Sequence, residues 1–390
     1  MSLSIIFFIV FVFILVVFLY IKRANLSIQK ILFPFFYVIL YRTKTGLALI
    51  EKWGSKYREF FRFLGLVCIG IGFFYMFIAV YNIGASYYLL IKYLFKPVFP
   101  ILVPGMSIPG EGVVSFSTWI IAIFVIATVH EFAHGVVAAA NKVKVKNTGF
   151  GFLSVIVPLF PAFFVEPDEK NLRKQSDVVQ YSIFAAGPVA NLLVYLLFIF
   201  LISFALTPLT EKYSEPLGVS MEAINQDYPA GKFFDGRVTV TKVNGAAVND
   251  SEQFADSVTG IVPGQNIVLG ILNGSTYKLV AAKDPDNPEK GYLGVFGFKN
   301  EVNWHNKMLG GFLSWLISLS RMLALLNLIV ALVNLMPIFI TDGARMIEVA
   351  ASKMFKNKMT AKKVWFIVNI LVVVLVVGSI FLPYLLKWLI

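Results

Sequence analysis

The sequence predicts a polytopic α-helical membrane protein of about six transmembrane helices, with a short membrane-associated β-hairpin and an inserted extracytoplasmic α+β domain. Three observations predict this fold class. Of the 390 residues, 58% are hydrophobic and 14% are charged, whereas a soluble domain carries about 25% charged residues. Six apolar runs are long enough to cross a bilayer. One block, residues 211–303, is polar, rich in turn residues and free of long apolar runs.

The six apolar runs define the predicted membrane spans, because a transmembrane helix needs about 20 apolar residues. In order, the spans are residues 2–21, 63–91, 116–140, 182–206, 310–333 and 364–386. We expect the first to be an uncleaved anchor with its N-terminus outside, because its positive charges, Lys22 and Arg23, follow it. Residues 31–41 are apolar but too short to span, so we expect them at the membrane interface or packed on other helices.

The charge distribution orients these spans. The net charge is +12, which in a soluble protein would suggest nucleic acid as a partner. Here the basic residues gather between predicted spans, in segments 42–62, 142–146, 170–174 and 353–363. The positive-inside rule assigns these segments to the cytosol. Block 211–303 carries 12 acidic and 8 basic residues, a net charge of −4, which places it outside. The charge therefore indicates a lipid bilayer and no nucleic-acid partner.

The polar block carries local signals for strands, turns and one helix. The predicted elements are a strand at 238–243 closed by the turn Asn244-Gly245, a helix at 251–258, and a hairpin of 265–272 with 277–281. The block is therefore expected to fold as a separate α+β domain.

Metal-binding chemistry is concentrated in the third predicted span, which contains Thr128-Val-His-Glu-Phe-Ala-His-Gly135. Residues i and i+4 of a helix share one face, so His130 and His134 can present two imidazoles to one metal ion. Glu131 lies about 100° further round the helix, where it can act as general base on a water molecule. An ionisable residue inside a membrane costs about 2.5 kcal/mol or more and is rarely there without a task. This arrangement predicts zinc-dependent hydrolysis.

A catalytic zinc takes a third protein ligand besides two imidazoles. His305 lies just outside the fifth span on the external side, and Cys68, the only cysteine, is on an earlier helix. Asp342 follows the fifth span on the side where the two motif histidines lie, so we select Asp342. Its alternative role is a helix N-cap before Gly343, and by position alone the cap is the simpler interpretation.

Three motifs together resemble the site-2 protease family of intramembrane zinc metalloproteases, in its PDZ-containing prokaryotic form. In the order typical of that family, they are His130-Glu131-x-x-His134, Gly187-x-x-x-Asn191 and Asn334-x-x-Pro337-x-x-x-x-Asp342-Gly343. The resemblance implies that His130, His134 and Asp342 bind Zn2+ and that Glu131 is the catalytic base. It also implies that Asn334 positions the scissile strand or its oxyanion. Many members have an apolar residue before the Asp-Gly pair and a second Gly after it, where this chain has Thr341 and Ala344.

Four further residues are expected to contact the substrate: Gly149, Gly151, Gly187 and Asn191. Gly187 and Asn191 are four apart on one helix face, where the glycine also allows close helix packing and the asparagine can hydrogen-bond across the bundle. Gly149 and Gly151 open the stretch 149–165, which is apolar but broken by Gly and Pro. This stretch is either a short hairpin dipping beside the active site or an interfacial loop.

The polar block resembles the PDZ domain of bacterial family members. The signature is Pro229-Ala230, then Gly236-x-Val-x-Val-x-x-Val-Asn244-Gly245-x-x-Val248, then Pro263-Gly264. PDZ grooves hold an extended peptide by strand addition and often capture a C-terminal carboxylate. Peptide C-termini are therefore expected partners, with Leu217-Gly218-Val219 as the expected carboxylate loop. The alternative is a spacer that shields the entrance.

The resemblance thus implies a metalloendopeptidase that hydrolyses peptide bonds within or near the transmembrane segments of single-span membrane proteins. The alternative is an inactive zinc-binding membrane scaffold that recruits partners through the PDZ-like domain. We expect the plasma membrane of a prokaryote, with the active site toward the cytosol and the PDZ-like domain outside. The expected divisions are N-terminal spans with a basic cytosolic loop (1–112), a catalytic membrane core in two parts (113–210 and 304–346), the PDZ-like insert (211–303), and a basic segment with the last span (347–390).

Overall fold

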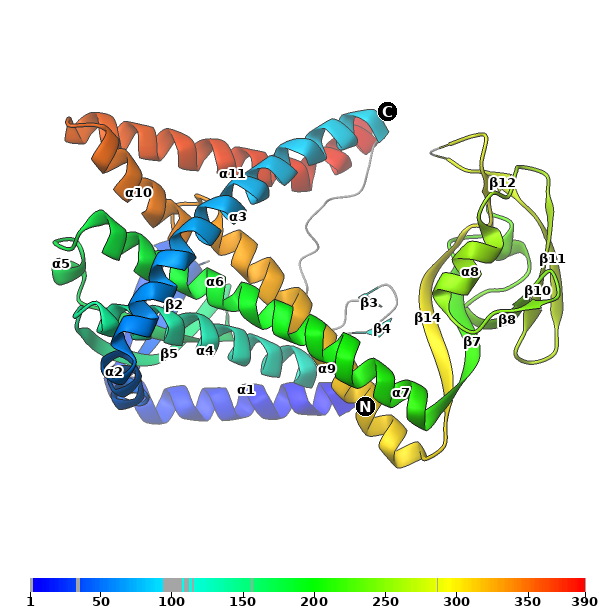
Figure 1. Cartoon of the computed structure of the whole chain (residues 1–390), viewed down its shortest axis with the longest axis horizontal. Coiled ribbons are helices and arrows are strands. Elements are labelled where there is room, and N and C mark those ends of the chain that lie inside the picture. The colour runs from blue at the N-terminus through cyan, green and yellow to red at the C-terminus, as the bar shows by residue number, and fades with distance from the viewer. Residues whose placement is uncertain are drawn as a thin grey trace. The chain divides into compact units, whose positions relative to one another are not determined.

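The computed structural model of the chain describes residues 3–32, 36–93, 107–108, 112–113, 116–155, 157–285 and 287–389. The chain divides into two compact units (Figure 1), and each is described by itself. Unit 1 comprises Met1–Ile101, Phe116–Ile199 and Arg321–Ile390, and unit 2 comprises Leu102–Ser115 and Phe200–Ser320. The external loop that the sequence predicts at 92–112 lies mostly outside the described residues.

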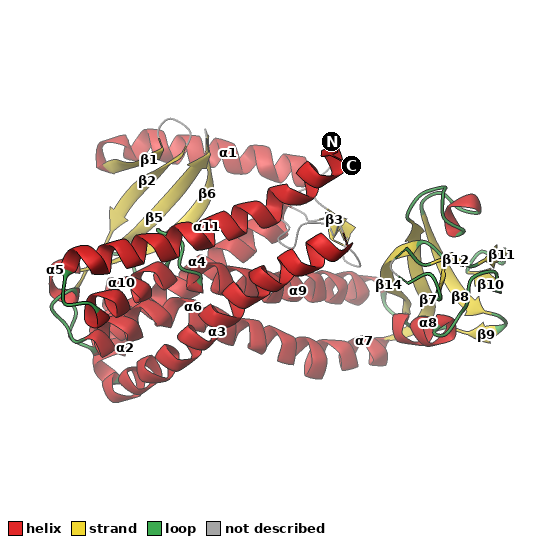
Figure 2. Ribbon diagram, turned by 90° about the horizontal axis from the view of Figure 1, so that it is seen from above, coloured by secondary structure: helices red, strands yellow, loops and turns green. Residues whose placement is uncertain are grey.

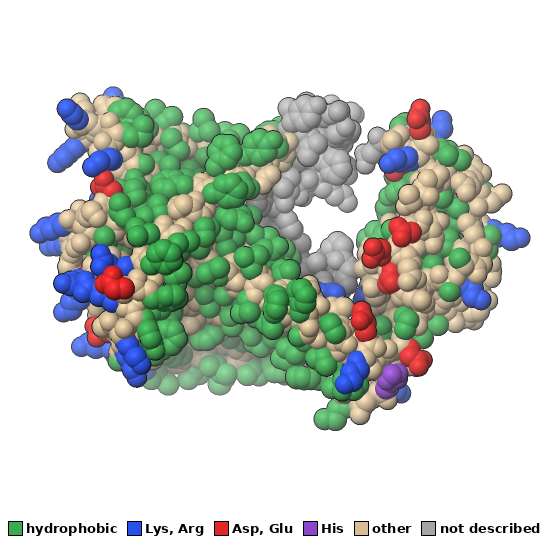
Figure 3. All heavy atoms as spheres, viewed as in Figure 1, with side chains coloured by type: hydrophobic (Ala, Val, Ile, Leu, Met, Phe, Trp, Pro, Cys, Tyr) green, Lys and Arg blue, Asp and Glu red, His purple; other side chains and the backbone are tan. Residues whose placement is uncertain are grey.

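Among the described residues, six helices are long and apolar enough to cross a membrane, which confirms the six predicted spans. They are α1 (Leu3–Lys22), α3 (Arg58–Tyr93), α4 (Phe116–Ala140), α6 (Asp177–Leu201), α9 (Lys307–Leu335) and α11 (Lys358–Leu389). Large apolar side chains on these helices are exposed, among them Phe77 at 70% and Val374 at 63%, and hydrophobic side chains cover the helix flanks in Figure 3. An apolar surface this extensive is stable only in lipid. The chain is an integral membrane protein.

A four-stranded antiparallel sheet belongs to unit 1 (Figure 2). Its strands are β1 (Leu26–Leu32), β2 (Phe36–Thr43), β5 (Val145–Val155) and β6 (Val157–Pro167), in the order β1-β2-β5-β6. The expectation for residues 31–41 was incomplete, because residues 31–32 belong to β1 and residues 36–41 belong to β2; residues 33–35 lie outside the described residues. Alternating branched and aromatic residues such as Tyr37, Ile39 and Tyr41 favour extended backbone, and β2 pairs with β5 from Phe36↔Val155 to Thr43↔Thr148.

The backbone N–H groups of β6 alternate between pointing toward β5 and pointing away from the sheet. Asp168, just after β6, donates its N–H to Lys144 O at 2.8 Å, so even-numbered N–H groups at this end point toward β5. The N–H groups of Phe163 and Val165 therefore point away from the sheet, since successive groups alternate. Pro161 and Pro167 share this parity and have no N–H to offer.

One polar network ties the four strands together at one end of the sheet. Arg42 in β2 donates its Nε–H to Glu166 Oε2 in β6 at 3.0 Å and an Nη1–H to Ser27 Oγ in β1 at 2.6 Å. Asn147 in β5 donates Nδ2 to the same Glu166 oxygen at 2.9 Å. The Asn147 amide and the Arg42 guanidinium hold the pKa of Glu166 below its ordinary range.

The core of unit 1 surrounds the C-terminal half of α4. Helix α2 (Leu47–Lys56) packs Ile50 and Gly54 against it, and α10 (Asp342–Met354) contributes Met346. Ile50 and Met346 are both 0% exposed. A side chain at Gly54 would collide with Ala139, so the glycine lets α2 approach α4 closely.

Unit 2 contains a six-stranded sheet of order β11-β10-β8-β7-β14, with β9 paired to β8. The elements are β7 (Ser214–Ala223), β8 (Arg237–Val243), β9 (Ala246–Ala247), α8 (Ser251–Val258), β10 (Asn266–Ile271), β11 (Thr276–Val280) and β14 (Val295–Trp304). They confirm the strand, helix and hairpin predicted within 238–281. Met221, Val240 and Ile267 form its core at 0% exposure each.

Two further points concern this unit. The predicted turn is present, because Asn244 and Gly245 both have positive φ, at 51° and 87°. The expectation of a carboxylate loop at Leu217-Gly218-Val219 is wrong, because this segment lies within β7 and pairs with β8 and β14. The PDZ resemblance itself stays a prediction.

The remaining elements are short. They are η1 (Arg23–Asn25), β3 (Ser107–Ile108), β4 (Gly112–Val113), α5 (Glu169–Leu172), the π-helical turn η2 (Ile202–Leu206), α7 (Thr207–Tyr213), η3 (Ala230–Lys232), β12 (Ala282–Lys283) and β13 (Gly291–Tyr292).

Candidate metal centre

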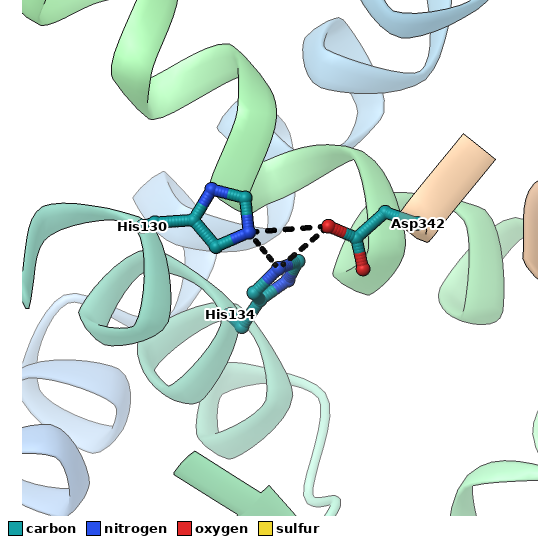
Figure 4. Close-up of side chains that lie close together, drawn as sticks. All are labelled: His130, His134 and Asp342. Carbon is teal, nitrogen blue, oxygen red and sulfur yellow. Dashed lines mark hydrogen bonds and ion pairs between the residues drawn. The ribbon is translucent and has the colours of Figure 1, made fainter. Parts of the chain in front are cut away.

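Three predicted ligands converge in unit 1 (Figure 4). Helix α4 places His130 and His134 one turn apart, and Asp342 approaches them from the start of α10. His130 Nε2 and His134 Nε2 each lie 3.2 Å from Asp342 Oδ2 and 3.2 Å from one another. All three side chains are largely buried, at 10%, 11% and 13% exposure. The three ligand atoms thus form a nearly equilateral triangle within a membrane protein.

The dimensions of this triangle fit a tetrahedral metal ion. Zinc–nitrogen bonds of about 2.0–2.1 Å at tetrahedral angles separate neighbouring ligand atoms by about 3.3 Å. Two imidazole nitrogens and a carboxylate oxygen are donors that zinc prefers. Without a cation, two Nε2 lone pairs facing each other and a carboxylate would repel one another. The donor set and its spacing therefore fit Zn2+.

The outer ring nitrogens of both histidines have partners. His134 Nδ1 lies 2.6 Å from Ile183 O, to which it can only donate, so the Nε2 lone pair is free for a metal. His130 Nδ1 lies 3.2 Å from the carboxamide of Asn191, which is 0% exposed. Asn191 Oδ1 has no hydrogen-bond partner among the described residues. A half-turn of the carboxamide gives this oxygen the Nδ1–H of His130 and leaves Nε2 free.

Asp342 is not the N-cap of α10, although position alone favoured that role. Thr341 is the cap, because its Oγ1 accepts the N–H of Ala344 at 3.3 Å. The same hydroxyl donates to Met336 O at 2.5 Å. Because Thr341 caps the helix, the carboxylate of Asp342 is available to the histidines. Thr341, one of the two residues by which this chain departs from the common family motif, therefore caps the helix.

Two glycines permit the close approaches that form the centre. A side chain at Gly343 would overlap the backbone of Leu335, where α9 ends. A Cβ at Gly187 would overlap Nε2 of His134 and lie 2.7 Å from its Cδ2. Gly187, predicted to contact the substrate, is thus in contact with a ligand ring, which agrees with a packing role. Asn191, predicted with it, contacts the other ring.

Glu131 is held by the sheet rather than by the triangle. Its Oε2 accepts the N–H of Val165 in β6 at 2.9 Å. Val165 also packs on α4 at Gly135, where a Cβ would come within 3.2 Å of its side chain. The outward-facing edge of β6 therefore meets α4 at the predicted catalytic base.

Three other predicted residues are placed differently. Asn334 donates Nδ2 to Val330 O of its own helix at 3.0 Å. Gly149 and Gly151 lie on β5, an interior strand paired with both β2 and β6. Their backbone groups are therefore engaged within the sheet, and the free edge nearest the metal centre is β6. The roles of Asn334, Gly149 and Gly151 in substrate binding stay predictions.

The sequence analysis missed three contributors: Thr341, Val165 and Ile183. The last two act through backbone groups, which carry no side-chain signal. Thr341 was visible, since a Thr before Asp-Gly at a helix start is a typical N-cap.

Comparisons with known proteins agree with this geometry. The sequence pattern described as peptidase family M50 matches residues 118–378 of the chain. The chain is also 30% identical over 315 residues to the uncharacterized protein MJ0971 of Methanocaldococcus jannaschii, covering 77% of this chain and 74% of that protein. The region that matches the family, residues 118–378, contains α6, α9, α10 and all but the first two residues of α4.

Proposed function

The chain belongs to peptidase family M50, the site-2 protease family, and on this premise we propose that it is an intramembrane zinc metalloprotease. It would hydrolyse peptide bonds within or near the transmembrane segments of other membrane proteins. The observation that carries the proposal is the convergence of His130, His134 and Asp342 to 3.2 Å from one another. The two elements that supply them, α4 and α10, belong to a chain in whose described residues six helices are long and apolar enough to cross a membrane.

The three ligands would hold Zn2+, which supplies Lewis-acid activation of a water molecule and of the peptide carbonyl when bound. Glu131 accepts the proton of the attacking water on its carboxylate and passes it to the leaving nitrogen. The N–H of Val165 holds one carboxylate oxygen of Glu131, which fixes the side-chain orientation and leaves the other oxygen for the proton. Asn334, which follows the apolar part of α9, would stabilise the oxyanion after a change of its side-chain rotamer.

The substrate must reach this site as an extended chain. A helix in lipid satisfies its carbonyls internally, so the scissile segment has to unwind before attack. The outward edge of β6 is adjacent to Glu131 and can pair with an unwound segment by strand addition. The peptide would therefore contact β6 rather than Gly149 and Gly151, which lie on an interior strand of the sheet.

The proposed orientation follows from the basic segments that flank the spans at the metal-centre end. Side chains such as Lys142, Lys353 and Lys363 support a cytosolic position for that end, because positive loops stay in the cytosol. Unit 2 would then lie on the external side of the membrane. On its PDZ resemblance, it would bind the C-termini of substrate or partner peptides. Cleavage would release a cytosolic fragment of a single-span protein.

The test uses the purified full chain reconstituted with a model single-span substrate. The wild type is expected to bind about one zinc per chain and to cleave. Glu131→Gln, which keeps the size of the side chain, should retain the zinc and lose at least about 100-fold in cleavage rate. Zinc is measured by mass spectrometry of the element and cleavage by gel. A wild type that binds zinc and cleaves nothing would favour the inactive scaffold, and unchanged cleavage by Glu131→Gln would refute the base assignment.

A further inference from the structure

Helix α2 and the first turn of α3 form an elbow with a cavity on its surface. The cavity has a volume of about 540 Å3 and is lined by Lys52, Trp53, Lys56, Tyr57, Phe60 and Phe61. None of the metal-centre residues lines it. Two of the lining residues are cationic, four are aromatic and none is acidic, so the cavity combines positive charge with apolar surface.

The side chains of the elbow are open to a ligand. Trp53, Tyr57 and Phe60 are 43%, 46% and 58% exposed. Lys56 Nζ lies 5.1 Å from the ring centroid of Tyr57, and no ion pair is recorded for Lys52 or Lys56 among the described residues. Two acidic residues are near in sequence: Glu59 is paired with Arg62 at 3.2 Å, and Glu51, which precedes Lys52 in α2, does not line the cavity. The two lysines are therefore not neutralised within the part of the chain that the structure describes.

The elbow lies at the level of a membrane surface. Helix α3, which is long and apolar enough to cross a membrane, starts at Arg58, immediately after Tyr57, and its uninterrupted apolar run starts at Phe63. Basic side chains gather at this end of unit 1, near α2, α5 and α10 (Figure 3). Trp and Tyr are typical of the zone between headgroups and acyl chains, and lysines in that zone attract anionic lipids.

We propose that the elbow is a binding site for one anionic phospholipid. The phosphate of the headgroup lies between the ammonium groups of Lys52 and Lys56, which are one helical turn apart. Trp53 and Tyr57 surround the glycerol region, and an acyl chain follows Phe60 along α3. The two lysines favour an anionic headgroup. The apolar surface of α3 that follows can hold an acyl chain, which favours a lipid over a soluble phosphate.

The elbow is attached to the helix that carries the metal ligands. Trp53 stacks edge-on against Phe132 of α4 with ring centroids 5.8 Å apart. Arg58 donates Nε to Ala140 O at the C-terminal end of α4 at 3.0 Å. A lipid in the cavity would therefore contact Trp53, which itself packs on α4, and would stabilise that packing.

The test is native mass spectrometry of the full chain in detergent, titrated with phosphatidylglycerol, phosphatidylcholine or water-soluble glycerophosphoglycerol. Tighter binding of phosphatidylglycerol than of the other two is expected. Lys52→Gln with Lys56→Gln should weaken that binding by roughly 30-fold, about five-fold for each lysine. Lys362→Gln with Lys363→Gln, the matched control on α11, removes the same charge from exposed positions and should leave binding unchanged.

A second variant separates charge from folding. Lys52→Arg with Lys56→Arg keeps both cations and should bind phosphatidylglycerol like the wild type. Equal losses in the Gln pair and its control, or equal binding of phosphatidylcholine, would overturn the proposal. Equally tight binding of the soluble phosphodiester would overturn the lipid as occupant. None of these outcomes depends on catalysis, so the inference stands or fails independently of the proposed protease activity.

Discussion

The imidazole of His134 lies so close beneath the backbone of Gly187 that a methyl group at position 187 would overlap its Nε2 atom. Helix α6 therefore passes over α4 at a position where a residue without a side chain meets a predicted metal ligand. His134 is held from the same helix by Ile183 O, which accepts Nδ1–H at 2.6 Å. One helix thus sets both the position and the tautomer of this ring.

Gly187→Ala should displace the ring and weaken zinc binding by about 10–100-fold, as changes beside metal ligands commonly do. The measurement is zinc affinity in a competition titration with a chelator. Gly70→Ala is the control, because a Cβ there meets nothing within 4 Å. Gly70→Ala should leave zinc affinity unchanged, and a similar loss in both variants would point to a general helix effect.

Asp342→Ala should remove zinc from the purified protein, because only the two imidazoles remain. A metal that binds the folded state raises its stability by mass action, so a chelator should lower the Tm of the wild type. The same chelator should not change the Tm of Asp342→Ala. Glu348→Ala removes a carboxylate from the same helix, one that pairs with Arg173 at 3.4 Å, and should keep its zinc. Zinc retained by Asp342→Ala would contradict the ligand assignment.

Val165→Pro should lower kcat by roughly 10–100-fold while zinc stays bound, because it deletes the N–H that holds Glu131, and a hydrogen bond to a charged group is worth about 1.5–3 kcal/mol. Proline is tolerated on an edge strand where the N–H points outward. Val165→Ala keeps the N–H and should lose little activity. Equal kcat values for the two variants would show that the backbone donor has no part in positioning Glu131.

Glu166→Gln should destabilise the protein near neutral pH. The Asn147 amide and the Arg42 guanidinium depress the pKa of Glu166 in the folded state. The stabilisation is therefore present above the ordinary pKa and is lost as the pH falls through the lower folded value. Both side chains of the ion pair are more than a third exposed, so its contribution is under about 1 kcal/mol. The expected Tm difference of roughly 1–3 °C at about pH 7 should shrink as the pH falls below the ordinary glutamate pKa of about 4.3, and a constant difference down to the acid end of the titration would contradict the linkage.

The membrane helices were the most predictable part of the fold, because length and apolar composition are local properties of a span. The third span matches α4 at both ends. The sheet of unit 1 was less predictable. Residues 31–41 are apolar, and their strand pairing depends on β5, more than 100 residues later in the chain. A segment buried by a distant partner carries no local signal of that partner.

The metal centre was also predictable only where its residues follow from one local element. His130 and His134 follow from helical periodicity alone, whereas Asp342 needed the motif order, because its local context also allows an N-cap. The structure resolves this ambiguity through Thr341, whose hydroxyl caps α10. Asn191 and Gly187 were expected to contact substrate, but the closeness of each to a histidine ring depends on the crossing of α6 over α4. Periodicity within one helix cannot give such a crossing.

The prolines of β6 limit the number of backbone N–H donors on its outward edge. Pro161 and Pro167 supply no donor, and the donor of Val165 is already occupied by Glu131, which leaves Phe163 as the free outward amide between residues 161 and 167. So few donors hold a peptide backbone weakly, although the outward carbonyls of these residues can still accept hydrogen bonds. On the proposed function, the selection of a substrate then depends on how readily its transmembrane helix unwinds. Helix-breaking residues in the substrate should matter more than any recognition sequence.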